Sequence, residues 1–243
     1  MTLKKGNFAQ QYNACINDPL GQGVEGTVYL CYNGVFKIFH KTIPENILNN
    51  KLEILEYMSM IKLNENHPSI MIAEELFFEG DKFSGYLMGE APTTSFADAV
   101  KGKSIDEILE LAKNLENLIR VLHSYNIYAT DLTELNIKVY ENTIYLIDVD
   151  SFCKGETIRT KDVPVAYRCP YSKKISKQSN LFTVRLLTII ALTGEEFYDC
   201  DSSFFNRIIL KNKLKKLELD KNIKKELLKI FSKKGFESLD YMF

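Results

Sequence analysis

The chain of 243 residues is long enough to bury a sizeable hydrophobic core, either as one bilobal unit or as two small domains. Hydrophobic residues make up 45% of it and charged residues 26%, as in ordinary globular proteins. The formal net charge of −1 gives no general attraction to nucleic acids or membranes. No apolar run approaches the length of a membrane span, and the first residues lack the apolar stretch of a signal peptide, so we expect a cytoplasmic protein.

The cysteines are scattered, odd in number, and form neither a C-x-x-C motif nor a Cys/His cluster with metal-ligand spacing. This pattern favours reduced thiols over disulfides or a metal site. The cysteines are Cys15, Cys31, Cys153, Cys169 and Cys200.

Residues 20–40 predict two strands joined by the dipeptide Asn33-Gly34, a strong signal for a two-residue hairpin. A G-x-G-x-x-G pattern precedes the hairpin; its glycines are Gly21, Gly23 and Gly26. The pattern also fits dinucleotide-binding folds, but there it opens a helix. Here Val28 and its neighbours continue as a strand, which favours a hairpin whose glycines let backbone N–H groups approach phosphates.

Lys37 lies in the next strand, within Val35-Phe36-Lys37-Ile38. The alternation of a strand places Val35 and Lys37 on one face. The alternative is a surface lysine on a half-exposed strand. A helix is predicted over residues 44–63 from its apolar spacing, with Glu53 and Glu56 one turn apart near one face.

A second hairpin is predicted from residues 73–78 and 83–88, and it leads into the loop 89–92. A long helix follows over residues 104–124, because Ser104 and Glu107 form a capping box ahead of an apolar stripe. Further helices are predicted over 180–192, an apolar run, and over 210–231, a lysine-rich run. Acidic residues interleave with those lysines, so we expect a solvated face and no nucleic-acid partner.

Polar residues flank a third hairpin, formed by residues 137–140 and 143–147. Asp131 and Asn136 precede it, and Asp148 and Asp150 follow it. Because a hairpin brings its two ends together, these oxygen-bearing side chains should converge, as a hard cation such as Mg²⁺ requires. Taken singly, each residue also fits a simple turn or strand end.

These motifs, in this order, resemble the eukaryotic-like Ser/Thr protein kinases. Ala129-Thr130-Asp131 stands where that family has H-R-D, and Asp148-Val149-Asp150 stands where it has D-F-G. The run Asp148 to Phe152 resembles the D-x-D-S-F motif of a bacterial branch of the family. The resemblance implies an α+β, protein-kinase-like bilobal fold: one domain over 1–243, with a β-rich lobe at about 1–89, a hinge at 89–92 and a helical lobe at 93–243.

The resemblance also implies Mg-ATP-dependent phosphotransfer to a protein substrate. The net charge and the lack of a long apolar run predict no membrane partner. Asp131 would take the proton of the acceptor hydroxyl, and Lys37, braced by Glu53 or, less favoured, Glu56, would grip the α- and β-phosphates. Asn136 and Asp148 would hold Mg²⁺. The implied ATP-binding residues are Gly21, Gly23, Gly26, Val28, Val35, Lys37, Met88, Glu90 and Ala91.

The chain departs from the family pattern at several positions. Thr130 replaces the arginine of H-R-D, Thr133 replaces a lysine that helps the γ-phosphate, and Lys138 stands where an apolar residue floors the adenine. Two alternatives therefore stay open: a nucleotide-binding pseudokinase that acts as a scaffold, and a kinase-fold enzyme that phosphorylates a small molecule.

Overall fold

The computed structural model describes residues 3–7, 11–12, 15–158, 165–197 and 204–243. The fold is mixed, with a β-rich sheet and several helices. The chain divides into two compact units, of which the first comprises Met1–Ala91 and Leu146–Asp150 and the second comprises Pro92–Tyr145 and Ser151–Phe243. The chain therefore returns to the first unit for a short segment after it has entered the second.

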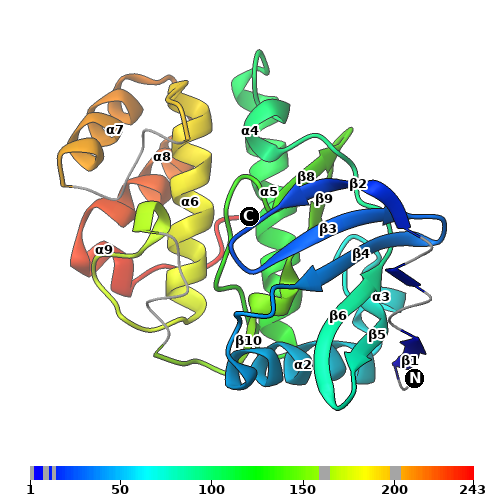
Figure 1. Cartoon of the computed structure of the whole chain (residues 1–243). Helices are drawn as coiled ribbons and strands as arrows, with labels where there is room; N and C mark the ends of the chain where they lie inside the picture. Colours follow the sequence, from blue (N-terminus) through cyan, green and yellow to red (C-terminus); the bar gives the residue numbers. More distant parts are fainter. Residues whose placement is uncertain (1–2, 8–10, 13–14, 159–164, 198–203) are drawn as a thin grey trace. The chain divides into compact units, whose positions relative to one another are not determined.

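The first unit is built on a six-stranded sheet in the spatial order β1-β5-β6-β4-β3-β2 (Figure 1). Its strands are β1 (Lys4–Asn7), β2 (Cys15–Gln22), β3 (Gly26–Cys31), β4 (Gly34–Phe39), β5 (Ala73–Glu79) and β6 (Lys82–Met88). Both predicted hairpins of this region are confirmed. In the first of them the turn residues are Tyr32 and Asn33, because Gly34 already pairs with Cys31.

The two faces of this sheet carry different side chains. Phe36 of β4 packs edge-on against Phe77 of β5, with ring centroids 4.8 Å apart, in an apolar cluster that also contains Leu87. The alternation of β4 turns Lys37 and Phe39 to the other face. Helix α2 (Glu45–Met60) lies on that face, since the Lys51 ammonium is 5.7 Å from the centre of the Phe39 ring.

The second unit is mainly helical, and α5 (Ile105–Ser124) packs against α6 (Lys177–Thr193), as Figure 1 shows. The predicted capping box of α5 is present: the Ser104 hydroxyl accepts the Glu107 N–H, and the Glu107 carboxylate accepts the Ser104 N–H. Helix α6 is buried on all sides from Ser179 to Leu192, which agrees with its largely apolar sequence.

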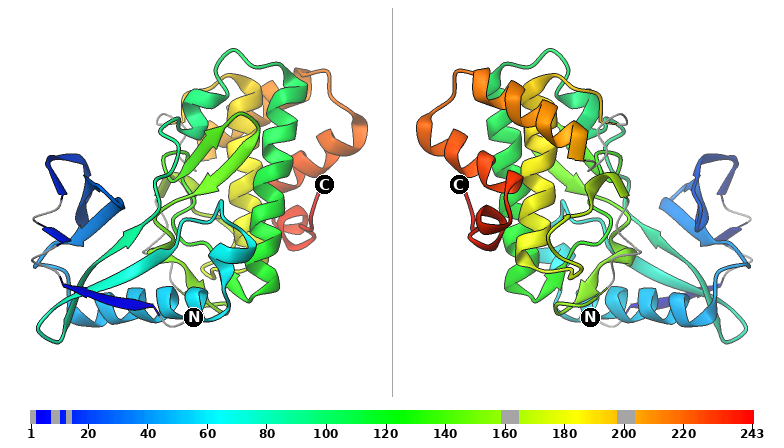
Figure 2. Two further views of the ribbon diagram at one scale, coloured as in Figure 1. Left: turned by 90° about the vertical axis from the view of Figure 1, so that its right-hand side faces the viewer. Right: turned by 90° about the vertical axis from the view of Figure 1, so that its left-hand side faces the viewer.

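The second unit also contains strands and helices shorter than α5 and α6 (Figure 2). They are α4 (Phe96–Ala99), β7 (Ile127–Tyr128), β8 (Ile137–Tyr140), β9 (Thr143–Leu146), β10 (Cys153–Lys154), α7 (Phe204–Lys216), α8 (Lys221–Leu228) and α9 (Lys233–Glu237). The last residue of β9 belongs to the first unit. The single helix predicted over 210–231 is wrong, because Asp220 caps a new helix by accepting the N–H groups of Asn222 and Ile223.

The expectation that every cysteine is a reduced thiol is also wrong. Cys31 is disulfide-bonded, whereas Cys153 and Cys169 are free. Cys15 lies opposite Cys31 in the register of β2 and β3, a proximity that linear spacing does not reveal. No helix in the described part of the chain is long and apolar enough to cross a membrane.

Candidate functional site

The glycine turn lies between β2 and β3, where the Gly23 N–H donates to the Gly26 carbonyl at 2.9 Å. A Cβ on Gly26 would lie 2.5 Å from the Ile38 carbonyl oxygen, so this glycine is required by the close approach of β4. Gly21 and Gly23 are exposed, and a Cβ on either would meet no heavy atom closer than 3.8 Å. The packing of the described chain therefore does not explain why these two positions are glycine.

Four residues that the sequence assigns to nucleotide binding share one face of the sheet. Val28 pairs with Lys37 across β3 and β4, and Val35 pairs with Met88 across β4 and β6. Directly paired residues point to the same side, and Val35 and Lys37 are two apart on one strand, so all four side chains lie on the face that α2 covers. Glu90 and Ala91, the other predicted adenine contacts, follow β6 in a segment without regular structure, with Glu90 exposed.

Lys37 is buried on this face and pairs with two carboxylates. Its Nζ donates to Asp148 Oδ1 at 3.1 Å and to Asp150 Oδ1 at 3.2 Å. Burial alone would lower the pKa of Lys37, but the carboxylates of Asp150 and Asp148 act in the opposite sense and hold that pKa well above its usual value. The ammonium is therefore charged across the physiological range, as a phosphate-binding lysine must be.

Asp148 ends the third predicted hairpin in a backbone conformation that few non-glycine residues adopt, with φ of 55°. The conformation turns the chain into the short 3₁₀ helix Val149–Ser151. About a third of the Asp148 side chain is exposed (34%), whereas that of Asp150 is buried (1%). Strained residues of this kind are enriched at functional sites, and here one carboxylate keeps access to solvent.

The predicted pairing of Lys37 with Glu53 or Glu56 is not formed. Both glutamates are exposed on α2. The buried residues of that helix are Leu48, Lys51, Ile54, Leu55, Met58 and Ser59, a spacing of three and four that places Lys51 on the inner face. The side chain that α2 presents to the charged cluster is therefore a lysine.

Lys51 pairs with Glu25 Oε2 at 2.8 Å and with Asp150 Oδ2 at 3.4 Å. Burial would raise the pKa of Asp150, but Lys37 and Lys51 reverse this effect and lower it below its usual value. Close by, burial and Asp150 raise the pKa of Tyr86 well above its usual value, so the Tyr86 hydroxyl is neutral.

Five ionised side chains thus lie together in the first unit. We call them the charged cluster: Glu25, Lys37, Lys51, Asp148 and Asp150.

In the second unit, Asp131 and Asn136 lie together, as the sequence predicts. The Asn136 side-chain amide donates to Asp131 Oδ2 at 2.9 Å and to the Asp131 carbonyl at 3.1 Å. The Thr133 carbonyl accepts the Asn136 N–H, which closes the turn between them. Asn136 belongs to the second unit and Asp148 to the first, so their convergence on a metal ion stays a prediction.

The backbone just before Asp131 is braced by Asn180 of α6. Asn180 Oδ1 accepts the Ala129 N–H at 3.0 Å, and Asn180 Nδ2 donates to the Ala129 carbonyl. The bond to the Ala129 carbonyl identifies the nitrogen of the Asn180 amide, so the atom that faces His123 is the oxygen, which can only accept. The contact of His123 Nε2 with Asn180 Oδ1 at 3.0 Å therefore requires a proton on Nε2. His123 Nδ1 then accepts from the Tyr241 hydroxyl at 2.9 Å.

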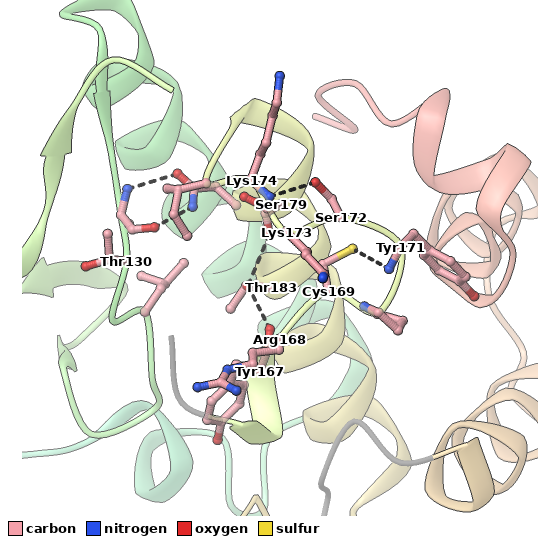
Figure 3. A pocket seen from close by; sticks show the side chains of 15 residues that line it. Thr130, Tyr167, Arg168, Cys169, Tyr171, Ser172, Lys173, Lys174, Ser179 and Thr183 are labelled. Carbon is pink, nitrogen blue, oxygen red and sulfur yellow. Dashed lines mark hydrogen bonds between the residues drawn. The ribbon is translucent and has the colours of Figure 1, made fainter. Parts of the chain in front are cut away.

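A cavity of about 470 Å³ lies beside this braced segment, within the second unit (Figure 3). Its lining includes the cations Arg168, Lys173 and Lys174, and none of its lining residues is acidic. Burial raises the pKa of the Cys169 thiol in this lining to about 11, so the thiol is protonated at neutral pH.

The described residues contain no group of three or more His, Cys, Asp or Glu side chains that could hold a metal ion. Mg²⁺ that accompanies phosphates keeps several waters and needs only one or two protein carboxylates. Asp148, with its partly exposed carboxylate, suits that use. A single accessible carboxylate suits Mg²⁺ that binds together with a nucleotide better than Mg²⁺ that is held by protein ligands alone.

Two members of the charged cluster, Glu25 and Lys51, were missed by sequence reasoning, and Asp150 was noted without a role. The spacing of Leu48, Lys51, Leu55 and Met58 already contained the signal for Lys51. No protein-family model matches this chain, and none of the curated proteins compared with it matches either. The case for a function therefore rests on the geometry and chemistry of these residues.

Proposed function

We propose that this protein is a Mg-ATP-dependent phosphotransferase of the protein-kinase type that acts on Ser or Thr hydroxyls of a protein. One observation carries the proposal: Lys37 and Asp148, which are 111 residues apart in the sequence, form an ion pair of 3.1 Å. These are the residues to which the kinase resemblance assigns the phosphates and the metal. In this proposal the first unit is the small lobe of a kinase-like bilobal fold and the second is the helical lobe.

The first unit supplies the groups for the nucleotide. Lys37 binds the α- and β-phosphates, and the exposed glycines Gly21 and Gly23 leave the backbone accessible to them. Val28, Val35 and Met88 give the same face of the sheet an apolar surface for the adenine, whose edge bonds the backbone near Glu90 and Ala91. Mg²⁺, with Asp148 and Asn136 as its assigned ligands, supplies positive charge that offsets the charge of the phosphates.

The second unit supplies the group for the acceptor. The Asp131 carboxylate takes the proton of the acceptor hydroxyl. At the same time the hydroxyl oxygen forms a bond to the γ-phosphorus, and the bond between that phosphorus and ADP breaks. The hydrogen bond from Asn136 orients this carboxylate. Asn180 fixes the backbone just before Asp131, because it bonds both the N–H and the carbonyl of Ala129.

Phosphate transfer from radiolabelled ATP, with Mg²⁺, to generic protein acceptors and to the protein itself tests the proposal. The wild type should transfer phosphate, and Mg-ATP at about 100 times its dissociation constant should add about 2.7 kcal/mol to the free energy of unfolding. Asp131→Asn keeps the shape of the side chain and removes the proton acceptor, so transfer should fall about 100-fold or more while Mg-ATP still raises Tm. No transfer and no Tm shift in the wild type would reject the proposal.

A nucleotide-binding pseudokinase is the second candidate, and one feature favours it. Thr133 stands where the kinase pattern has a lysine for the γ-phosphate, so a cation that would speed transfer is missing at that position. A pseudokinase would show the Tm shift with Mg-ATP, no transfer, and no change in either measurement for Asp131→Asn. The same assay therefore separates the two candidates.

A further inference from the structure

Asp150 is the central anion of the charged cluster. Its side chain is 1% exposed, and its two carboxylate oxygens face two different lysines, Lys37 at 3.2 Å and Lys51 at 3.4 Å. A buried carboxylate is costly unless it is paired, and removal of one partner leaves an uncompensated charge. The position of the Lys37 ammonium is therefore tied to that of Asp150, and the position of Asp150 to that of Lys51.

Lys51 extends the connection to the glycine turn. Its side chain is 5% exposed and comes from the middle of α2, and its Nζ also lies 2.8 Å from Glu25, between Gly23 and Gly26. One ammonium thus joins helix α2, the glycine turn and the segment that follows the third hairpin. The kinase pattern assigns this inward helix position to a glutamate, and here the charge is reversed.

We propose that Asp150 and Lys51 are positioning residues for the nucleotide: Asp150 orients the ammonium of Lys37, and Lys51 holds Asp150 and the glycine turn in register with it. The carboxylate that braces Lys37 is supplied by the segment after the hairpin, and the helix supplies a cation that braces this carboxylate. The inference rests on the proposed function, because the ligand for which Lys37 is oriented is the triphosphate of ATP.

The first part of the test uses no nucleotide. Tm is measured for Lys51→Met, Asp150→Asn and the double variant, with Lys62→Met as a control, since Lys62 is an exposed lysine just beyond α2. Each single cluster variant should lower Tm by about 5 °C or more, and the double variant should be no less stable than the worse single one, because the two residues act as a pair. Additive losses would overturn the pairing.

The second part measures Mg-ATP binding by calorimetry and kcat/KM for transfer. Lys51→Met should lower the affinity for Mg-ATP and kcat/KM by about tenfold or more. Lys51→Arg, which keeps the positive charge, should recover part of both losses. Glu53→Gln should change neither by more than about twofold, since Glu53 is exposed. A loss with Glu53→Gln as large as that with Lys51→Met would show that the glutamate braces Lys37 and would overturn the inference.

The two parts separate this inference from the proposed function. Wild-type protein that neither binds Mg-ATP nor transfers phosphate would reject the proposed function and the positioning role together, while the pairing measured without nucleotide would still be decided. If the wild type is active and both Lys51→Met and Lys51→Arg are as active as the wild type, only the positioning role is rejected.

Discussion

Lys37 shows how burial changes the expected behaviour of a single residue. A phosphate-binding lysine in an open cleft would be removable without loss of stability. Lys37 instead has a nearly buried side chain (7% exposed) and neutralises part of the charge of Asp150. Its substitution therefore affects the fold as well as any reaction, and activity alone cannot assign its role.

Lys37→Met should lower the free energy of unfolding by about 3 kcal/mol, because it leaves Asp150 buried with one cation in place of two. Urea denaturation measures this loss. Lys41→Met is the control: Lys41 is the next lysine along the chain, and its side chain is 87% exposed, so its substitution should cost less than about 0.5 kcal/mol. Equal stability of both variants would mean that the ion pair with Asp150 contributes nothing.

His123 should make stability depend on pH. Its pKa lies below the usual value, chiefly because burial disfavours the charged ring, with the Asn180 hydrogen bond opposing and Lys177 adding to the effect. At pH 7 both states are largely neutral. As pH falls below about 6.5, the unfolded chain takes up a proton before the folded one, so the free energy of unfolding decreases until the folded ring is also protonated.

His123→Gln keeps an amide donor near Asn180 and removes the titration. The urea midpoint of the wild type should fall between pH 7 and pH 5.5 by more than that of the variant. Parallel curves for the two proteins would show that His123 does not contribute to this pH dependence.

At the scale of elements, the sequence predicts what local chemistry determines. The two hairpins of the first unit, the capping box of α5 and the buried run of α6 all agree with the structure, because turn residues, caps and apolar spacing act over a few residues. The kinase pattern predicts an inward glutamate on α2, whereas the apolar spacing of the helix turns Lys51 inward and leaves Glu53 exposed. The disulfide at Cys31 and the ion pairs of Asp150 depend on strand register and chain crossing, which no local pattern specifies.

Ser104→Ala should destabilise the protein by about 1 kcal/mol, since it removes the side chain that accepts the Glu107 N–H at the start of α5. Ser104→Asp, which keeps an acceptor and places negative charge at the helix N-terminus, should restore the wild-type value within a few tenths of a kcal/mol. Thermal unfolding of the three proteins side by side measures both effects. A destabilisation as large for Asp as for Ala would mean that the cap is not what the serine supplies.

At the scale of the whole molecule, the second unit also has a buried ion pair. Arg185 of α6 faces Glu116 of α5 at 4.0 Å and Glu226 of α8 at 3.8 Å, and the side chains of Arg185 and Glu116 are fully buried. Arg185 also donates to the Asp240 carbonyl, and Glu116 accepts the N–H groups of Met242 and Phe243. The last residues of the chain are thus fixed to the helices of the second unit through charge.

Arg185→Met should lower the free energy of unfolding by about 3 kcal/mol, because the buried Glu116 carboxylate then keeps only Arg120, a partly exposed cation at 3.8 Å. Glu116→Gln in the same background should return part of that loss, since it removes the buried charge that has lost its buried cation. Guanidinium denaturation of the single and double variants provides the measurement. Further destabilisation in the double variant would show that Glu116 does not depend on Arg185.

The short return of the chain to the first unit has a consequence for the order in which the protein is made. Leu146–Asp150 is held there by backbone hydrogen bonds of Leu146 with Ser69 and Met71, and it carries both carboxylates that face Lys37. All six strands of the large sheet leave the ribosome before these residues do. The nascent sheet and helix α2 therefore emerge with two lysines, Lys37 and Lys51, whose aspartate partners are not yet synthesised. The first unit can be completed only after part of the second unit has been translated. An N-terminal fragment cut at the boundary of the first unit would keep this deficit permanently.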